Sequence, residues 1–132
     1  PTIIRSCLNG AEIPIYGDGQ NVRDWLFVND HCTGIELAFF KGKSGECYNI
    51  GGRNERTNLH IASKICEILD ELKPRANGGK YSDLISFVKD RAGHDKRYAI
   101  DASKIENTLG WRAKENFESG IVKTIEWYLS KS

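Results

Sequence analysis

The side chains of this sequence that could do chemistry are most concentrated between Asp90 and Asp101, where eight polar or charged residues surround Gly93. Their charges alternate in sign without the period of a helix or a strand, so the segment is poorly explained as the exposed face of a regular element. Arginine and histidine donors on a flexible loop suit a ligand that carries phosphate. The alternative is a loop whose ion pairs join two elements, and without a second motif that alternative is favoured.

A second candidate begins at Pro14, where an apolar run leads into the turn Gly17-Asp18-Gly19 and then to Arg23, Asp24 and Trp25. Taken alone, this pattern predicts a β-hairpin, because glycines permit the positive φ of a tight turn. A single Arg–Asp pair usually contributes less than about 1 kcal/mol, so ion pairing alone gives the arginine no strong structural role. The guanidinium nevertheless offers a planar fork of donors that matches phosphate oxygens and that lysine would not reproduce.

A third candidate lies between Tyr48 and Asn58, where a predicted strand and two glycines lead to the start of the most regular predicted helix. Exposed N–H groups and the positive end of the macrodipole at a helix start attract anions, and the Asn58 amide would add a donor. Plain capping by Thr57 or Asn58 explains the same residues without a ligand. The sequence supports the two interpretations equally.

Two patterns that would indicate a complete dehydrogenase site do not occur. The glycines form no dinucleotide-binding fingerprint, since Gly17-x-Gly19 is followed by Val22 where the third glycine should stand. No tyrosine is followed four positions later by lysine. His94 has no nearby nucleophile or carboxylate dyad, so a ligand contact is expected, whereas His31 and His60 are expected to be packing or surface residues.

Composition limits the possible classes of protein. With 132 residues, of which 39% are hydrophobic and 10% aromatic, the chain has the size of one domain and enough apolar residues for a core. A net charge of +1 provides no broad electrostatic footprint for nucleic acid or an anionic membrane. The four cysteines lack metal-ligand spacing and are interpreted as buried thiols of a reducing compartment. We expect a cytoplasmic protein with no metal site and no membrane span.

Short strands and amphipathic helices must position these segments. Leu59–Leu72 is the clearest predicted helix, with apolar residues at three- and four-residue spacing behind the caps Thr57 and Asn58. Asn29 or Asp30 is expected to cap the helix that ends before Gly42. The pattern indicates an α+β (mixed α/β) domain with about five helices. The other predicted helices cover residues 2–9, 101–109 and 117–129, and the predicted strands are Ile13–Tyr16, Trp25–Val28, Cys47–Ile50 and Leu84–Val88.

Taken in this order, the motifs resemble the dTDP-glucose 4,6-dehydratase family of extended short-chain dehydrogenases/reductases. The resemblance covers nearly the whole chain. Asn54-Glu-x-x-Asn58 and Asp90-Arg-x-Gly-His-Asp95 are close to diagnostic. Pro14-Ile-Tyr-Gly-Asp-Gly19 adds support, whereas Leu109-Gly-Trp111 is shared widely in the superfamily and is weakly specific.

The resemblance implies that residues 1–132 are the C-terminal nucleotide-sugar (substrate) binding domain of a larger enzyme. The full enzyme would hold NAD in an N-terminal Rossmann domain and convert dTDP-glucose to dTDP-4-keto-6-deoxy-glucose, in deoxysugar biosynthesis such as that of rhamnose. The catalytic and NAD-binding motifs would precede Pro1, so this chain alone is expected to bind no NAD and to be inactive. The missing Rossmann domain is the expected partner, and the full enzyme is expected to be a homodimer.

The resemblance also assigns substrate-binding residues. The strand that ends at Tyr16 would lie near the nucleoside, and the other assigned residues would surround the nucleotide and the diphosphate. Position 92 departs from the family pattern, because Ala92 replaces the usual proline, so this loop is expected to be less rigid before binding. The assigned residues are Pro14, Ile15, Tyr16, Arg23, Asn58, Asp90, Arg91 and His94.

Two other interpretations stay open. Another NAD-dependent nucleotide-sugar epimerase, dehydratase or decarboxylase of the superfamily would share the hairpin and differ in base and sugar. A free-standing binding module would have no Rossmann partner at all, although the start of the sequence at Pro1 favours a fragment.

Overall fold

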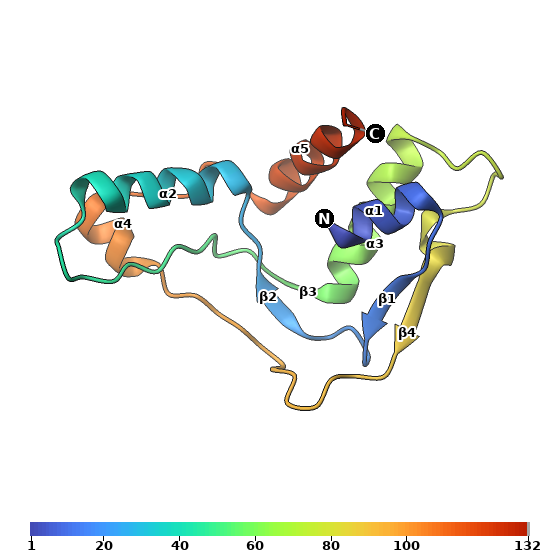
Figure 1. Cartoon of the computed structure of the whole chain (residues 1–132), viewed down its shortest axis with the longest axis horizontal. Coiled ribbons are helices and arrows are strands. Elements are labelled where there is room, and N and C mark those ends of the chain that lie inside the picture. Colours follow the sequence, from blue (N-terminus) through green and yellow to red (C-terminus); the bar gives the residue numbers. More distant parts are fainter. Residues whose placement is uncertain (132) are drawn as a thin grey trace.

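The structure of the protein, a computed structural model, describes residues 1–131 and contains five α-helices and short strands, as the predicted mixed α+β class requires. The helices are α1 (Thr2–Asn9), α2 (Val28–Lys41), α3 (Asn58–Leu72), α4 (Ser103–Leu109) and α5 (Phe117–Leu129), with one 3-10 helix, η1 (Tyr81–Leu84). The strands are β1 (Ile13–Tyr16), β2 (Val22–Asp24), β3 (Glu55–Thr57) and β4 (Ile85–Val88). Figure 1 shows α1, α3, β1 and β4 at one end of an elongated molecule and α2 with α4 at the other.

The strands form two separate two-stranded sheets. β1 pairs in parallel with β4, so that Ile13 lies opposite Ile85 and Tyr16 opposite Val88. β2 pairs antiparallel with β3, and an isolated bridge joins Val22 to Arg97. The predicted hairpin is therefore wrong, because the Gly17–Gly19 turn links strands of different sheets. Each strand finds its partner far along the sequence, and local turn chemistry does not reveal such pairing.

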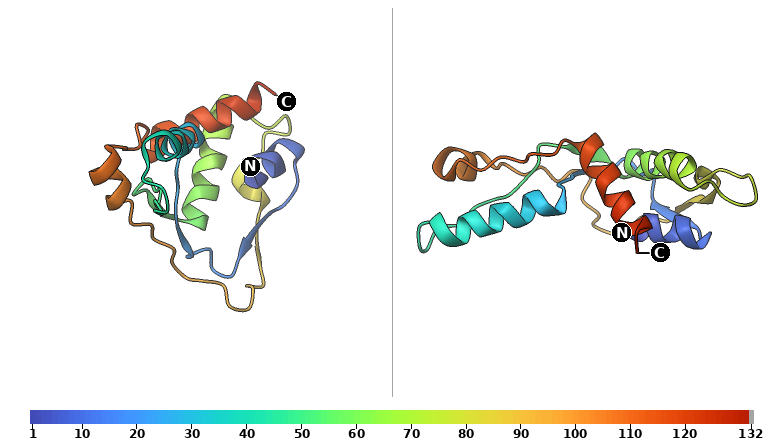
Figure 2. Two further views of the ribbon diagram at one scale, coloured as in Figure 1. Left: turned by 60° about the vertical axis from the view of Figure 1, so that its left-hand side comes forward. Right: turned by 90° about the horizontal axis from the view of Figure 1, so that it is seen from above.

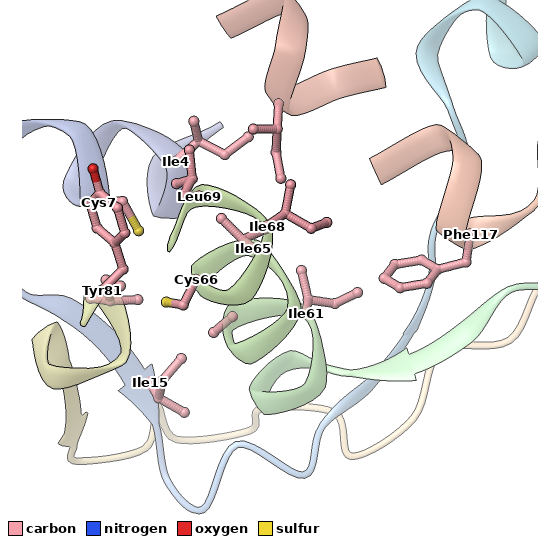
Figure 3. Close-up of a cluster of buried hydrophobic side chains, with 13 residues drawn as sticks. Ile4, Cys7, Ile15, Ile61, Ile65, Cys66, Ile68, Leu69, Tyr81 and Phe117 are labelled. Carbon is pink, nitrogen blue, oxygen red and sulfur yellow. The ribbon is translucent and has the colours of Figure 1, made fainter. Parts of the chain in front are cut away.

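The main hydrophobic core surrounds α3 (Figure 3). Its apolar positions recur every three or four residues and therefore share one broad face of the helix. Thr57 caps the helix as predicted, since its Oγ1 accepts a hydrogen bond from the His60 N–H at 3.1 Å. The side chains packed around this face come from α1, β1, η1 and α5. The buried members include Ile4, Cys7, Ile15, Ile61, Ile65, Cys66, Leu69, Tyr81 and Phe117.

A smaller hydrophobic cluster joins α2 to α4. Figure 2 shows these two helices at the other end of the molecule. Ala102, Ile105 and Trp111 are the buried residues of the cluster, and the Trp111 Nε1–H donates to Thr33 Oγ1 at 3.1 Å. This cluster has few members, so α2 gains little burial from it. Within residues 1–131, no helix has the length and apolar character that crossing a membrane requires.

The start of α2 differs from the prediction. The helix begins at Val28, with Phe27 as its N-cap, so Trp25–Val28 is not a strand, and neither Asn29 nor Asp30 caps it. Asp30 is buried instead, and its Oδ2 accepts a hydrogen bond from the Glu115 N–H at 2.9 Å. A buried carboxylate needs such a partner, so this acid connects α2 to the segment before α5.

Other predicted elements fare differently. The structure confirms the predicted helices α1, α4 and α5 and the predicted strand β4 within a residue or two. The predicted cap Asp101 lies one position before the N-cap of α4, and its carboxylate accepts a hydrogen bond from the Ser103 N–H at 2.9 Å. Residues 47–50 form no strand, and β3 was not predicted.

The prediction of four buried thiols is wrong for half of them. Cys7 and Cys66 are buried, whereas Cys32 and Cys47 are exposed.

Candidate functional site

The carboxyl ends of β1 and β4 meet at one edge of their sheet because the two strands run in parallel. The Gly17 N–H donates to the Val88 carbonyl at 2.9 Å, which fixes the two ends together. The loop from Lys89 to Asp101 begins at this edge and runs along the lower side of the molecule towards α4 (Figure 1). In parallel α/β arrangements, ligands bind beyond the carboxyl ends of the strands.

Four of the predicted site residues form one cluster at this edge. Asp90 Oδ1 lies 2.6 Å from His94 Nδ1, and the ring centroids of His94 and Tyr16 are 6.3 Å apart in an edge-on arrangement. The Arg91 guanidinium lies over the Tyr16 ring, 5.1 Å from its centroid. We call Tyr16, Asp90, Arg91 and His94 the β-edge cluster.

The glycine after β1 permits this close approach. Gly17 has a positive φ of 59°, and a Cβ at its position would lie 3.0 Å from Asp90 Oδ2. A larger residue there would be strained by its backbone conformation and would press on the carboxylate. The Gly17 position therefore helps to hold Asp90 beside the end of β1.

The Asp90–His94 hydrogen bond favours the ionised form of Asp90 and fixes the tautomer of His94. This bond lowers the pKa of Asp90, and the Arg91 backbone N–H, which donates to Oδ1 at 2.8 Å, acts in the same direction. An ionised carboxylate only accepts hydrogen bonds, so His94 carries its proton on Nδ1. The Nε2 atom of the ring is then the one that another group can meet.

Arg23 is held against the same loop by different contacts. Its guanidinium donates to the carbonyls of Val22 at 2.6 Å and Asp95 at 2.9 Å, and it lies 5.1 Å from the ring centroid of Tyr98. The buried Asn21 also donates to the Asp95 carbonyl, at 3.2 Å. These contacts attach the loop that carries Asp90, Arg91 and His94 to the β2 region through the Asp95 carbonyl.

Asn58 is the first residue of α3, and the start of this helix rests on the turn that follows β1. The Asn58 N–H donates to the Asn21 carbonyl and the Leu59 N–H to the Gly19 carbonyl, each at 3.0 Å. With the His60 N–H bonded to Thr57, the first three N–H groups of the helix have protein partners. The capping interpretation is therefore confirmed, and any anion contact here would come from the Asn58 side chain.

The remaining two predicted residues lie on opposite faces of β1. Pro14 is exposed and shares the face of Tyr16, because side chains alternate along a strand. Ile15 is 3% exposed and belongs to the core beside α3, so its side chain points away from that face.

Asp24 is a structural residue of the site that the sequence did not reveal. It forms no ion pair with its neighbour Arg23 within residues 1–131. Its carboxylate oxygens accept from the backbone N–H groups of Gly52 and Asn54, each at 2.8 Å. These bonds fix the glycine-containing loop just before β3 and α3. An acid that is 28 residues from the loop that donates to it gives no local sequence signal.

Part of the segment from Asp90 to Asp101 joins two elements through an ion pair, which was the alternative to ligand binding for this loop. Arg97 Nη2 lies 2.9 Å from both carboxylate oxygens of Glu55 in β3. Both side chains are at least partly exposed, so the pair contributes little free energy. The segment therefore combines a connector at Arg97 with a distinct cluster of donors near Arg91.

The described residues do not fit the phosphate-binding turn of an NAD site. Such a turn needs a glycine-rich loop between a parallel strand and a helix. Gly17 and Gly19 instead connect strands of two sheets, and Gly51 and Gly52 precede the short strand β3. Within residues 1–131 there is also no group of three or more acidic, histidine or cysteine side chains that would hold a metal ion.

Comparison with known sequences places the chain among nucleotide-sugar dehydratases. A family model described as GDP-mannose 4,6 dehydratase matches residues 1–124. The probable dTDP-glucose 4,6-dehydratase of Sinorhizobium fredii is 54% identical over 129 residues, which are 98% of this chain and 36% of that protein. The dTDP-glucose 4,6-dehydratase of Salmonella typhimurium is 51% identical over 132 residues, or 100% of this chain and 36% of that protein. The chain thus spans little more than a third of the length of these relatives.

Solved structures with the same fold support this placement. The dTDP-glucose 4,6-dehydratase of Bacillus anthracis, in complex with NAD, has a TM-score of 0.82 and 43% identity. The UDP-glucose 4-epimerase of Thermotoga maritima, with UDP-glucose, has a TM-score of 0.84 and 28% identity. Each match covers 98% of this chain and 38% of the solved chain. The resemblance of the motifs to dTDP-glucose 4,6-dehydratases is therefore confirmed, and because the family model matches residues 1–124 of 132, the chain belongs to the GDP-mannose 4,6 dehydratase family.

Proposed function

We propose that this chain is the nucleotide-sugar binding portion of a dTDP-glucose 4,6-dehydratase. The observation that carries the proposal is the β-edge cluster, in which the cationic Arg91 lies over the aromatic ring of Tyr16 and His94 lies beside it, at the ends of two parallel strands. A diphosphate needs cationic, planar donors, and a base needs an aromatic or apolar surface. Both requirements are met within a single small region.

Each group has a distinct role in this proposal. Arg91 would bind a diphosphate oxygen, and His94, oriented by Asp90, would accept a hydrogen bond at Nε2 from a hydroxyl group of the nucleotide sugar. Arg23 would extend the same cationic surface, since only some of its five donors are used by the carbonyls of Val22 and Asp95. The exposed Pro14 and the ring of Tyr16 would lie beside the nucleoside.

The chemistry of the whole enzyme would use groups outside the described residues. NAD would supply the hydride acceptor and donor, and residues 1–131 offer no strand–glycine–helix turn to hold it. We therefore infer that this chain binds and orients the dTDP-sugar and does not catalyse its dehydration alone. Cytoplasmic location and a homodimeric whole enzyme stay predictions.

Removal of the Arg91 guanidinium tests the proposal. We expect Arg91→Ala to weaken binding of dTDP to the chain by roughly 1.5–3 kcal/mol, the usual cost of a lost charge-assisted hydrogen bond. Isothermal titration calorimetry would measure it. Arg112→Ala is the matched control, because this exposed arginine lies in the α4–α5 connection and should leave the affinity unchanged.

Equal affinities for dTDP in the unchanged chain and in Arg91→Ala would contradict the proposed role. Arg23→Ala should cause a loss of similar size. Arg91→Ala is the cleaner of the two variants, because the Arg23 side chain also holds the loop through the Asp95 carbonyl.

A second candidate function is the same portion of a UDP-sugar enzyme. The high structural similarity to the Thermotoga maritima UDP-glucose 4-epimerase favours keeping it, since the match covers 98% of this chain and 38% of the epimerase chain. Competition between dTDP and UDP for the chain distinguishes the two. Preference for UDP would favour the epimerase interpretation, and preference for dTDP would favour the dehydratase.

A further inference from the structure

Two thiols that the proposed function does not use lie together in the main core. Cys7 of α1 and Cys66 of α3 are 2% and 1% exposed, and both belong to the buried cluster around α3. Figure 3 shows their sulfur atoms on the same side of α3, in the part of the core next to Tyr81. Two helices that are far apart in the sequence thus place a pair of sulfur atoms in one apolar region.

A hydrogen bond joins the two thiols. The contact with Cys66 is the main reason why the pKa of Cys7 lies below its usual value, and the same contact raises the pKa of Cys66. The Cys66 S–H therefore donates to the Cys7 sulfur. Because the thiolate is the reactive form of cysteine, Cys7 is the nucleophile of the pair and Cys66 is the thiol that keeps its proton.

A metal site does not explain this pair. A structural zinc ion takes four ligands, whereas the part of the chain that the structure describes, residues 1–131, has no group of three or more histidine, cysteine or acidic side chains placed to hold a metal ion. The carboxylate of Asp70 near these thiols has its own partner, since its Oδ1 accepts from the Tyr81 N–H at 3.0 Å. Both cysteines are free. The chemistry open to two adjacent free thiols is oxidation to a disulfide.

We propose that Cys7 and Cys66 are a redox-active pair, which hydrogen peroxide converts to a disulfide that links α1 to α3. In the first step the Cys7 sulfur attacks one peroxide oxygen and the O–O bond breaks. The products are Cys7 sulfenic acid and water, because the departing hydroxide takes the Cys7 proton. In the second step the Cys66 sulfur attacks the Cys7 sulfur, the S–O bond breaks, and hydroxide leaves as water with the Cys66 proton. The two sulfur atoms together lose two electrons, and the peroxide gains them.

The packing of α1 permits both steps. The hydrogen bond already holds the sulfur atoms in contact, so an S–S bond of about 2.0 Å requires only a small further approach of α1 to α3. Peroxide reaches the buried sulfur when α1 opens, and this helix has eight residues, of which Ile4 and Cys7 are buried. Local opening of so small an element costs less free energy than unfolding of the whole core. The proposal does not depend on the nucleotide site.

Peroxide treatment of the 132-residue chain tests the pair. Cys32→Ser and Cys47→Ser would first remove the two exposed thiols, so that only Cys7 and Cys66 can react. Peptide mass spectrometry without reduction should then find the Cys7 and Cys66 peptides joined, with the loss of two hydrogen atoms. The link closes a loop of about 60 residues, so the melting temperature should rise by at least about 5 °C and fall again with dithiothreitol.

A link that forms in urea but not in the folded chain would overturn the proposal. Joined peptides that come only from covalent dimers, identified on a non-reducing gel, would do the same. A link that does not raise the melting temperature would also contradict the proposal, because the bond would then not join α1 and α3 in their folded arrangement.

Single substitutions in the same chain test the order of the two steps. Cys66→Ser keeps a donor beside Cys7 but leaves its sulfenic acid without a second thiol, so Cys7 should gain oxygen atoms, which intact mass spectrometry would count. In Cys7→Ser, Cys66 should gain oxygen at least about tenfold more slowly, because burial raises its pKa and leaves less thiolate. Equal rates of oxidation in the two variants would contradict the proposed first step.

Discussion

Helices α2 and α3 have nearly the same length, 14 and 15 residues, but they bury their apolar side chains to very different extents. α3 buries six apolar residues in the main core, whereas the buried residues of α2 are Asp30 and Gly34. α2 nonetheless carries apolar residues on more than one side, a composition typical of helices that are covered by other elements. The difference shows that the main core of the described residues is built around α3 and that α2 contributes little apolar burial.

The β-edge cluster belongs to the first of these regions. It lies at the ends of β1 and β4, and β1 packs directly on α3 through the buried Ile15. Nucleotide binding should therefore depend on the packing of the α3 region and should be insensitive to changes on α2. This comparison gives three experiments on the chain itself, ordered by the size of the expected effect.

The largest effect is expected from truncation of a core residue. Ile65→Ala should lower the free energy of unfolding by about 2–5 kcal/mol, because a buried isoleucine loses its contacts and leaves a cavity. Ile35→Ala removes the same atoms from a side chain that is 52% exposed and should change the free energy by less than about 0.5 kcal/mol. Urea denaturation would measure both. Equal losses of unfolding free energy in the two variants would contradict the difference in burial between α3 and α2.

The next effect compares two glycines that share a positive φ. Gly19, with φ of 72°, has Ile15 Cγ2 at 2.7 Å and Leu59 Cβ at 2.9 Å from the position of a Cβ, whereas Gly45, with φ of 83°, has no atom within 4 Å. Both alanine variants bear the backbone strain, but only Gly19→Ala overpacks its surroundings. It should cost about 1–3 kcal/mol more than Gly45→Ala. A thermal unfolding difference near zero would show that the turn is not packed on α3.

The smallest effect concerns ionisation in the β-edge cluster. The hydrogen bond from His94 lowers the pKa of Asp90, so this carboxyl should titrate below its usual value of about 3.9. The folded state then gains stability above that usual pKa and loses it as the pH falls through the lowered value. Carbon-detected NMR would follow the titration.

His94→Ala should move the Asp90 titration upwards towards the usual value. Asp101 is the internal control, because its pKa is lowered mainly by the Ser103 side chain and should not respond to the substitution. If the Asp90 titration is the same with and without His94, the two side chains do not interact in solution.

Local signals in the sequence predicted the α3 region well. Thr57 and the three- and four-residue spacing behind it define α3 correctly, and Asn116, a cap that was not singled out, begins the predicted helix α5. The pairing of β1 with β4 was missed because the paired residues are about 72 positions apart, as for Ile13 and Ile85, and nothing local encodes such a partner. Asp30 was assigned to a cap because its type suits one, whereas the structure uses it in a buried contact with Glu115.

The sequence also predicted only part of the site, because contacts between distant segments leave no local signal. The motifs identified Tyr16, Asp90, Arg91 and His94, and the structure brings these four together. The contacts that fix the surrounding loops join distant segments and carry no motif: the Asp95 carbonyl accepts from Arg23, and the Asp24 carboxylate accepts from the Gly52 N–H. Residues 47–50 form no strand within residues 1–131 although their sequence favours one, because no described strand pairs with them.

The central claim is that the nucleotide sugar binds at the β-edge cluster in the α3 region. The most direct test is a ¹⁵N NMR titration of the chain with dTDP-glucose. We expect saturable shifts that are largest at Tyr16, Arg23 and residues 90–94, with no change along α2. Largest shifts on α2 or in residues 47–50, or no saturable shift at any concentration, would contradict it.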